Sequence, residues 1–174
     1  LLDYTDHHLA SGSVMTPFYQ DACLHANTVC VPTVDLKMAL DSHPGVTGGV
    51  SVVSDPLEYD LVPPKASLPS GRIRSMWFGH PSNATFLAQF IQRYSEQLAG
   101  QALHIVSAPQ TVEVLKQFRF SSPPDLSLSF EHWNVQAVST AAVTADYCII
   151  PSDPASPKRY ASNNRLVSAL ALGL

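Results

Sequence analysis

The segment Gly79-His80-Pro81-Ser82-Asn83 joins a glycine to polar residues that are common where helices begin. A glycine allows the backbone to come close to a ligand. Ser82 and Asn83 are typical of a helix N-terminus, where backbone amides and the helix dipole attract anions. We therefore take Gly79, His80, Ser82 and Asn83 as one side of a phosphate pocket. A single glycine turn is a far weaker signal than GxGxxG, and an ordinary capped turn is the alternative.

A second polar segment, residues 152–165, ends in Ser162, Asn163, Asn164 and Arg165. Amides, a hydroxyl and a planar guanidinium suit a diphosphate with attached sugar hydroxyls. Arg165 stands near the start of a predicted helix, which is the wrong end for a cation in the helix dipole. A bound anion or an ion pair explains the arginine better than helix stability does. The alternative is a solvated loop followed by a helix cap.

His132 and Trp133 follow a segment in which apolar and polar residues alternate. An aromatic ring at the end of a strand can flank a nucleobase, so both residues are candidates for the nucleobase side of a site. The alternative is that Trp133 covers the edge of a sheet.

Two carboxylates and two histidines fall within six residues, at Asp3, Asp6, His7 and His8. This composition allows acid–base chemistry. Their spacing matches no standard zinc motif, and adjacent imidazoles point apart on either a helix or a strand. We expect no metal and no other cofactor, and catalytic residues stay unassigned.

Apolar periodicity places these segments after strands and before helices from residue 73 onward. Strands are predicted at 73–79, 102–107, 126–133 and 146–151, and helices at 83–98, 111–118, 135–145 and 163–174. Repeated strand–helix units favour a parallel sheet with helices on both faces. The expected fold is therefore α/β, with a Rossmann-like doubly wound sheet. The apolar run at 148–150 predicts a central strand in it.

Residues 1–60 show a second α/β pattern, which starts part-way through a domain. Strands are predicted at 1–3, 28–32 and 50–54, with helices at 18–26 and 34–42. The stretch 55–72 is rich in Pro and Ser and has no periodicity. The expected organisation is the C-terminal part of one α/β domain at 1–60, a linker at 61–72, and a second domain at 73–174. We expect that second domain to be truncated at its C-terminus.

Composition narrows the choice of partners. The net charge is −4 and the pI is about 5.9, so no footprint for nucleic acid is visible. The sequence has no apolar run long enough for a membrane span and no signal peptide. The three cysteines form no CxxC pair, which favours a reduced, cytoplasmic setting. The chain opens on Leu-Leu-Asp, and we interpret it as a fragment.

Three short motifs resemble parts of GT-B glycosyltransferases of the group 1 type. Residues 146–152 (Asp-Tyr-Cys-Ile-Ile-Pro-Ser) and the helix at 164–174 resemble the end of the donor-binding half. The turn at 77–80 (Trp-Phe-Gly-His) resembles the first strand of that half, where a glycine precedes a residue near the donor phosphates. Residues 2–6 resemble a D-x-x-D at the end of the acceptor half.

The resemblance implies transfer of a sugar from a nucleotide-diphosphate sugar to an unknown acceptor, with no metal required. Retaining members of the family carry two glutamates that the chain replaces with Tyr160 and Ser168. In the family one of these glutamates hydrogen-bonds the donor ribose, and our hypothesis is that Asn163, Asn164 and Arg165 substitute for the missing carboxylates. We expect the fragment alone to be inactive.

Two other functions stay open from the sequence. One is a sugar-nucleotide epimerase of the same fold, for which Asp3 and Asp6 would be the carboxylates. The other is a non-catalytic α/β binding or scaffold module, which the missing glutamates favour. A truncated sheet would leave an unpaired edge, so self-association is also an expectation.

Overall fold

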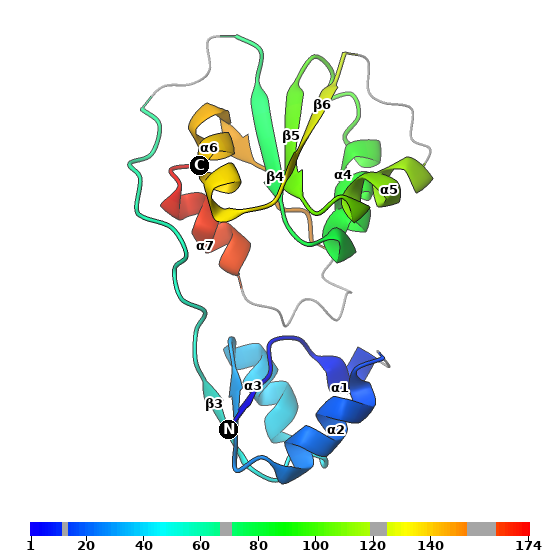
Figure 1. The fold of residues 1–174 in the computed structure, drawn as a ribbon, viewed down its shortest axis with the longest axis vertical. Helices are drawn as coiled ribbons and strands as arrows, with labels where there is room; N and C mark the ends of the chain where they lie inside the picture. Colours follow the sequence, from blue (N-terminus) through cyan, green and yellow to red (C-terminus); the bar gives the residue numbers. More distant parts are fainter. Residues whose placement is uncertain (12–13, 67–70, 119–124, 153–162) are drawn as a thin grey trace. The chain divides into compact units, whose positions relative to one another are not determined.

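The computed structural model describes residues 1–11, 14–66, 71–118, 125–152 and 163–174. Two compact units are present, one built on Leu1–Pro56 and the other on Leu57–Pro151 with Arg165–Leu174 (Figure 1). Each unit is α/β, with a parallel sheet of its own. The α/β prediction is therefore confirmed. The predicted domain boundaries and the linker at 61–72 stay a prediction.

The second unit holds a four-stranded parallel sheet in the order β6-β5-β4-β7. Its strands are β4 (Arg74–Phe78), β5 (Ala102–Ser107), β6 (Ser127–His132) and β7 (Tyr147–Cys148). Its helices are η1 (Pro81–Asn83), α4 (Ala84–Arg93), α5 (Gln110–Gln117), α6 (Val135–Thr144) and α7 (Asn164–Ala171). Successive strands run outward from β4 to β6, and the chain then returns to the other side of β4. The C-terminal end of β4 is therefore the point where the strand order reverses.

Both faces of this sheet are covered, as Figure 1 shows. Met76 and Phe78 of β4 pack in a core with residues of α6 and α7. Trp77, which lies between them in the strand, packs with residues of α4 and α5. Because successive residues of a strand point to opposite faces, the run Met76-Trp77-Phe78 of β4 has to be apolar to fill both cores.

Within the described residues β7 lies at the edge of the sheet and pairs only with β4. The predicted central position is therefore not observed. The apolar run is explained by the helices, since Cys148 and Ile150 pack in the core of α6 and α7 while Ile149 packs in the core of α4. A strand covered on both faces has this pattern even at an edge.

Helix α7 ends in a Schellman motif. Gly173 has a φ of 79°, its amide donates to the Leu170 carbonyl, and the Leu174 amide donates to the Ala169 carbonyl. Gly173 therefore ends the helix that the sequence predicts at 163–174. Segment 57–65, which lies before β4 in the chain, packs against this end of α7, because the Val62 amide donates to the Ala171 carbonyl at 2.7 Å.

The first unit contains a three-stranded parallel sheet in the order β1-β2-β3. Its elements are β1 (Leu2–Asp3), α1 (His8–Ser11), α2 (Thr16–His25), β2 (Thr28–Val31), α3 (Val34–Asp41) and β3 (Gly49–Val52). Tyr4, Val29, Leu36 and Leu40 are fully buried in its core. The strands and longer helices fall within two residues of the predicted bounds, and α1 was not predicted.

Candidate anion-binding site

Gly79 lies directly after β4, at the point where the strand order reverses. In doubly wound sheets this position, outside the carboxyl ends of the strands, is where ligands bind. The Ser107 hydroxyl donates to the Gly79 carbonyl at 2.5 Å and lies 2.7 Å from the Thr111 hydroxyl. Ser107 and Thr111 are both fully buried. The turn is therefore held in place from the end of β5 and the start of α5.

His80, Ser82 and Asn83 follow in the same turn, as the sequence placed them. Nδ1 of His80 accepts a hydrogen bond from the Ser82 amide at 3.2 Å and lies 3.0 Å from the Ser82 hydroxyl. The Asn83 amide donates to the His80 carbonyl at 2.9 Å. These two amides, which the sequence offered as phosphate ligands, are thus already hydrogen-bonded in this structure. A charged donor has to come from elsewhere.

Arg165, in the first turn of α7, supplies that charge. A Cβ placed on Gly79 would lie 3.5 Å from Nη1 of Arg165 and 3.6 Å from its Cδ. The guanidinium therefore rests against the bare backbone of Gly79. Burial lowers the pKa of Arg165, and interaction with Cys148 acts in the opposite direction. Burial also raises the pKa of the Cys148 thiol to about 12, so the cysteine brings no negative charge to the arginine.

Two buried nitrogen atoms near Gly79 lack hydrogen-bond partners. Among the described residues, Nη1 of Arg165 and Nε1 of Trp77 are the buried side-chain atoms without one. The Trp77 ring also borders the turn, because Cζ2 would lie 3.3 Å from a Cβ on Gly79. A buried donor without an acceptor costs about 1–3 kcal/mol. Rearrangement around an anionic ligand would supply acceptors here.

The other residues predicted in the same polar segment as Arg165 differ in burial and in whether the structure describes them. Asn163 is exposed, and Asn164 is the first residue of α7. Ser162 and Tyr160 lie outside the described residues. Ser168, at a position where the GT-B resemblance expects a glutamate, is 2% exposed and contributes to the inner face of α7.

His132 and Trp133 lie at the same end of the sheet as Gly79, where the strands have their carboxyl ends. The Trp133 amide donates to the Ser107 carbonyl at 3.0 Å, so Ser107 links Trp133 to the Gly79 turn. Nδ1 of His132 lies 3.2 Å from the Trp133 carbonyl. Trp133 is 44% exposed, which leaves its ring accessible.

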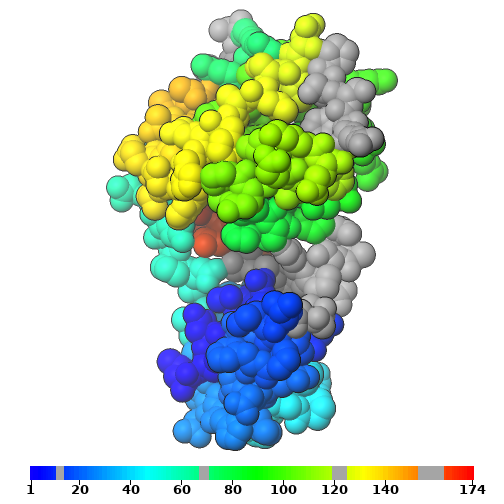
Figure 2. Space-filling model, turned by 45° about the vertical axis from the view of Figure 1, so that its right-hand side comes forward, coloured from blue at the N-terminus to red at the C-terminus, as the bar shows by residue number. Residues whose placement is uncertain are grey.

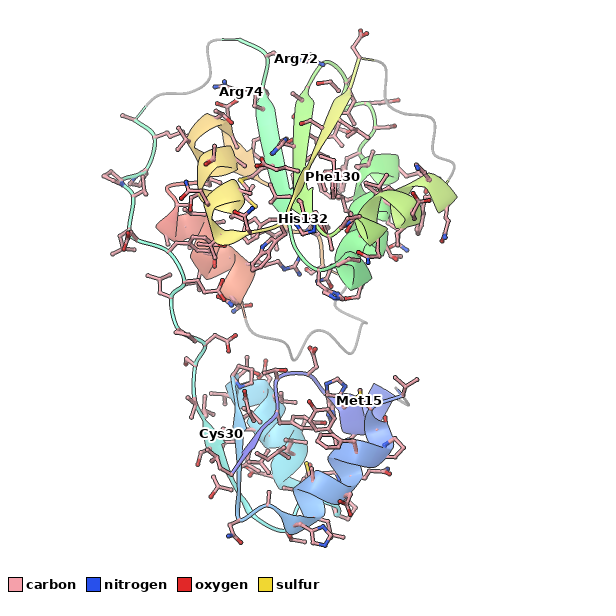
Figure 3. The ribbon with its side chains drawn as sticks, in the orientation of Figure 1. Met15, Cys30, Arg72, Arg74, Phe130 and His132 are labelled. Atoms are coloured by element: carbon pink, nitrogen blue, oxygen red, sulfur yellow. The ribbon has the colours of Figure 1, made fainter. Side chains whose placement is uncertain are left out.

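At the opposite end of the sheet, where the strands begin, Arg72 and Arg74 have a structural role. Figure 3 shows Arg72 and Arg74 at the end of the sheet away from His132. Arg72 donates to the carbonyls of Gly100 and Gln101, and the Arg74 amide donates to the Asp146 carboxylate at 2.7 Å. This basic pair therefore fixes the start of the strands.

In the first unit the candidate acid–base residues have different surroundings. Asp3 and Asp6 are exposed. His8 stacks on Tyr19, with ring centroids 4.3 Å apart. Within the described ranges no group of three or more His, Cys, Asp or Glu side chains could hold a metal ion.

Sequence reasoning missed Trp77 and Ser107. Trp77 occupies an apolar strand, where its pattern indicates only a core residue. Ser107 ends a strand and precedes Ala-Pro, which carries no phosphate-binding signal. Only the three-dimensional register brings both to Gly79.

No protein-family model matches the chain, and no curated protein matches its sequence. None of the helices in the described part of the chain is long and apolar enough to cross a membrane.

Proposed function

We propose that the chain binds a nucleotide-diphosphate sugar and belongs to a GT-B-like glycosyltransferase. In this proposal the second unit is the donor-binding half. The reaction is transfer of the sugar to an acceptor whose nature is open. The observation that carries the proposal is the buried, unpartnered Nη1 of Arg165 against Gly79, at the strand-order reversal.

A diphosphate suits this position for electrostatic reasons. The nucleoside diphosphate is the leaving group and gains negative charge as the sugar is transferred, and a cation beside it stabilises that charge. Arg165 can form charge-assisted, forked hydrogen bonds to phosphate oxygens. The α4 dipole, whose positive end follows the Gly79 turn, adds to the attraction. Neither contribution needs a metal ion.

The remaining candidate residues fit around this point. His80, Ser82 and Asn83 shape the turn on one side, while Asn163 and Asn164 directly precede Arg165 on the other. His132 and Trp133 lie at the same end of the sheet, two strands away from β4. This separation suits the nucleobase of an extended ligand.

Titration calorimetry of the 174-residue chain with UDP, GDP and ADP tests the proposal. At least one nucleoside diphosphate should bind, and Arg165→Ala should weaken that binding at least tenfold. A charge-assisted hydrogen bond contributes about 1.5–3 kcal/mol, and 1.4 kcal/mol corresponds to a factor of ten.

Arg93→Ala is the matched control. It removes the same charge from the last turn of α4, where Arg93 lies over the Tyr94 ring. Affinity should stay within twofold of the parent. The proposal fails if none of the three nucleotides binds, or if both arginine variants bind equally well.

A further inference from the structure

Three polar side chains on strands β5 and β6 form a continuous chain of hydrogen bonds. Nδ1 of His104 lies 2.7 Å from Oγ of Ser129, and Nε2 of His104 lies 3.1 Å from Oε2 of Glu131. The parallel register places His104 directly opposite Ser129. Glu131 follows two residues later on the same strand and so shares its face. One imidazole therefore contacts both side chains.

When the His104 ring is neutral, the hydrogen-bond network orders the protons in this chain. An ionised carboxylate can only accept, so Nε2 of His104 carries the proton and donates to Glu131. Nδ1 of the neutral ring is then the acceptor, and the Ser129 hydroxyl donates to it. This assignment follows from the hydrogen-bond network. It matches the arrangement that activates a serine: a nucleophile, a base bonded to it, and a carboxylate that orients the base.

The three groups are accessible. The side chains of His104 and Glu131 are 31% and 46% exposed, and Ser129 is exposed. Figure 2 shows the atoms of β6 and the start of α6, in yellow, at the surface. Small molecules in solution can therefore reach Ser129.

The Phe130 amide, which follows Ser129 in the chain, is a candidate backbone donor. The amides of Ser127 and Trp133 donate to carbonyls of Gln101 and Ser107, so alternate β6 amides face β5. By that alternation the Phe130 amide faces the outer side of β6, where no strand of the described residues pairs. An amide that follows the nucleophile is well placed to stabilise an oxyanion.

We propose that Ser129 is a nucleophile activated by His104 and Glu131, and that it reacts with activated acyl esters. Oγ of Ser129 bonds to the ester carbonyl carbon, and the bond from that carbon to the leaving oxygen breaks. The serine proton passes to Nδ1 of His104 and then to the leaving oxygen. Water hydrolyses the acyl-serine, releasing the carboxylic acid and restoring the hydroxyl. This site is independent of the proposed nucleotide site.

A fluorophosphonate probe tests the proposal, because Ser129 would displace its fluoride and keep the phosphonyl group. Peptide mass spectrometry of the labelled 174-residue chain should locate the adduct on Ser129. Ser129→Ala should abolish labelling, and His104→Asn should slow it at least tenfold, within the usual contribution of a general base. Glu131→Gln should slow it as well, since the neutral amide orients the ring without stabilising its charge.

Ser127→Ala is the matched control, because Ser127 is exposed on the same face of the same strand. It should label at the parent rate. With p-nitrophenyl acetate, release of p-nitrophenol should depend on Ser129 and not on Ser127. Labelling confined to other residues, acetylation of His104 itself, or a Ser129 no more reactive than Ser127 would overturn the proposal. Locating the adduct by peptide mass spectrometry uses the parent chain, so this part of the test does not depend on whether a variant folds.

Discussion

Gly79 and Arg165 meet because a glycine has no side chain. The aliphatic and guanidinium parts of Arg165 occupy the space next to the Gly79 backbone, and the Trp77 ring closes another side. A Cβ at this position would fill the space between the two side chains and crowd the Trp77 ring. The same close approach leaves Nη1 beside the strand end, where an anion would be bound.

Gly79→Ala should reduce affinity for the nucleoside diphosphate that binds the parent chain by about tenfold, which corresponds to about 1.4 kcal/mol of binding free energy. A methyl group there would lie 3.3 Å from the Trp77 ring, which would have to shift, and 3.5 Å from Nη1 of Arg165, where it would cover the backbone beside the guanidinium. Calorimetric titration measures the change. Gly71→Ala is the control, because a Cβ there meets no atom within 4 Å. Equal affinities for the two variants would contradict this account of the contact.

At the level of the elements, α7 is held at its far end by segment 57–65. A Cβ on Gly173 would lie 2.7 Å from the Pro63 carbonyl oxygen, which shows how closely this segment seats on the helix. Lys65 also donates to the carbonyls of Ala142 and Ala145, at the C-terminus of α6. A cation there interacts favourably with the helix dipole. The segment thus fixes the ends of two neighbouring helices.

Lys65→Ala should lower the free energy of unfolding of the second unit by about 1 kcal/mol, because it removes a cation and its bonds from the end of α6. Urea unfolding followed by tryptophan fluorescence measures this, since both tryptophans of the chain, Trp77 and Trp133, lie in that unit. Lys116→Ala, which breaks an exposed pair with Glu113, should change stability by less than about 0.5 kcal/mol. A Lys65 variant as stable as the Lys116 variant would exclude a role for Lys65 at the helix end.

The elements were largely predictable, and the contacts between them were not. Residues 102–107 have the predicted bounds of β5 because apolar strand residues stand out between polar turns. The His104, Ser129 and Glu131 chain could not be found in this way. It depends on the register of β5 against β6, and sequence spacing carries no information on that register. The polar turn at Gly79 was found, while its buried neighbour Trp77 was indistinguishable from an ordinary core residue.

At the scale of the whole molecule, burial raises the pKa of titratable groups in both units, Tyr4 in the first and Cys148 in the second. Tyr4 is fully buried in the first unit, and burial raises the pKa of its phenol to about 12. The Leu9 amide donates to its oxygen at 2.8 Å and opposes this shift. The folded state therefore favours the neutral phenol, and this contribution to stability is complete below pH 10 and lost as the pH rises towards 12.

Between pH 8 and pH 11 the parent chain should lose about 1.4 kcal/mol more stability than Tyr4→Phe, which has no phenol to ionise. Urea unfolding followed by far-ultraviolet circular dichroism measures the loss, and tryptophan fluorescence reports on the second unit separately. The comparison uses the pH dependence of each protein, since Tyr4→Phe also loses the bond from Leu9. Identical pH dependence in the two proteins would rule out Tyr4 as the titrating group.

The unpartnered Nη1 of Arg165 has an evolutionary consequence. Folding alone gains nothing from a buried donor without an acceptor, and an apolar side chain of similar length would fill the same space at lower cost. If the chain had no ligand, random substitution would therefore tend to replace this arginine with methionine or leucine. Related sequences that diverge elsewhere but retain both Arg165 and Gly79 would reveal purifying selection for binding at this turn.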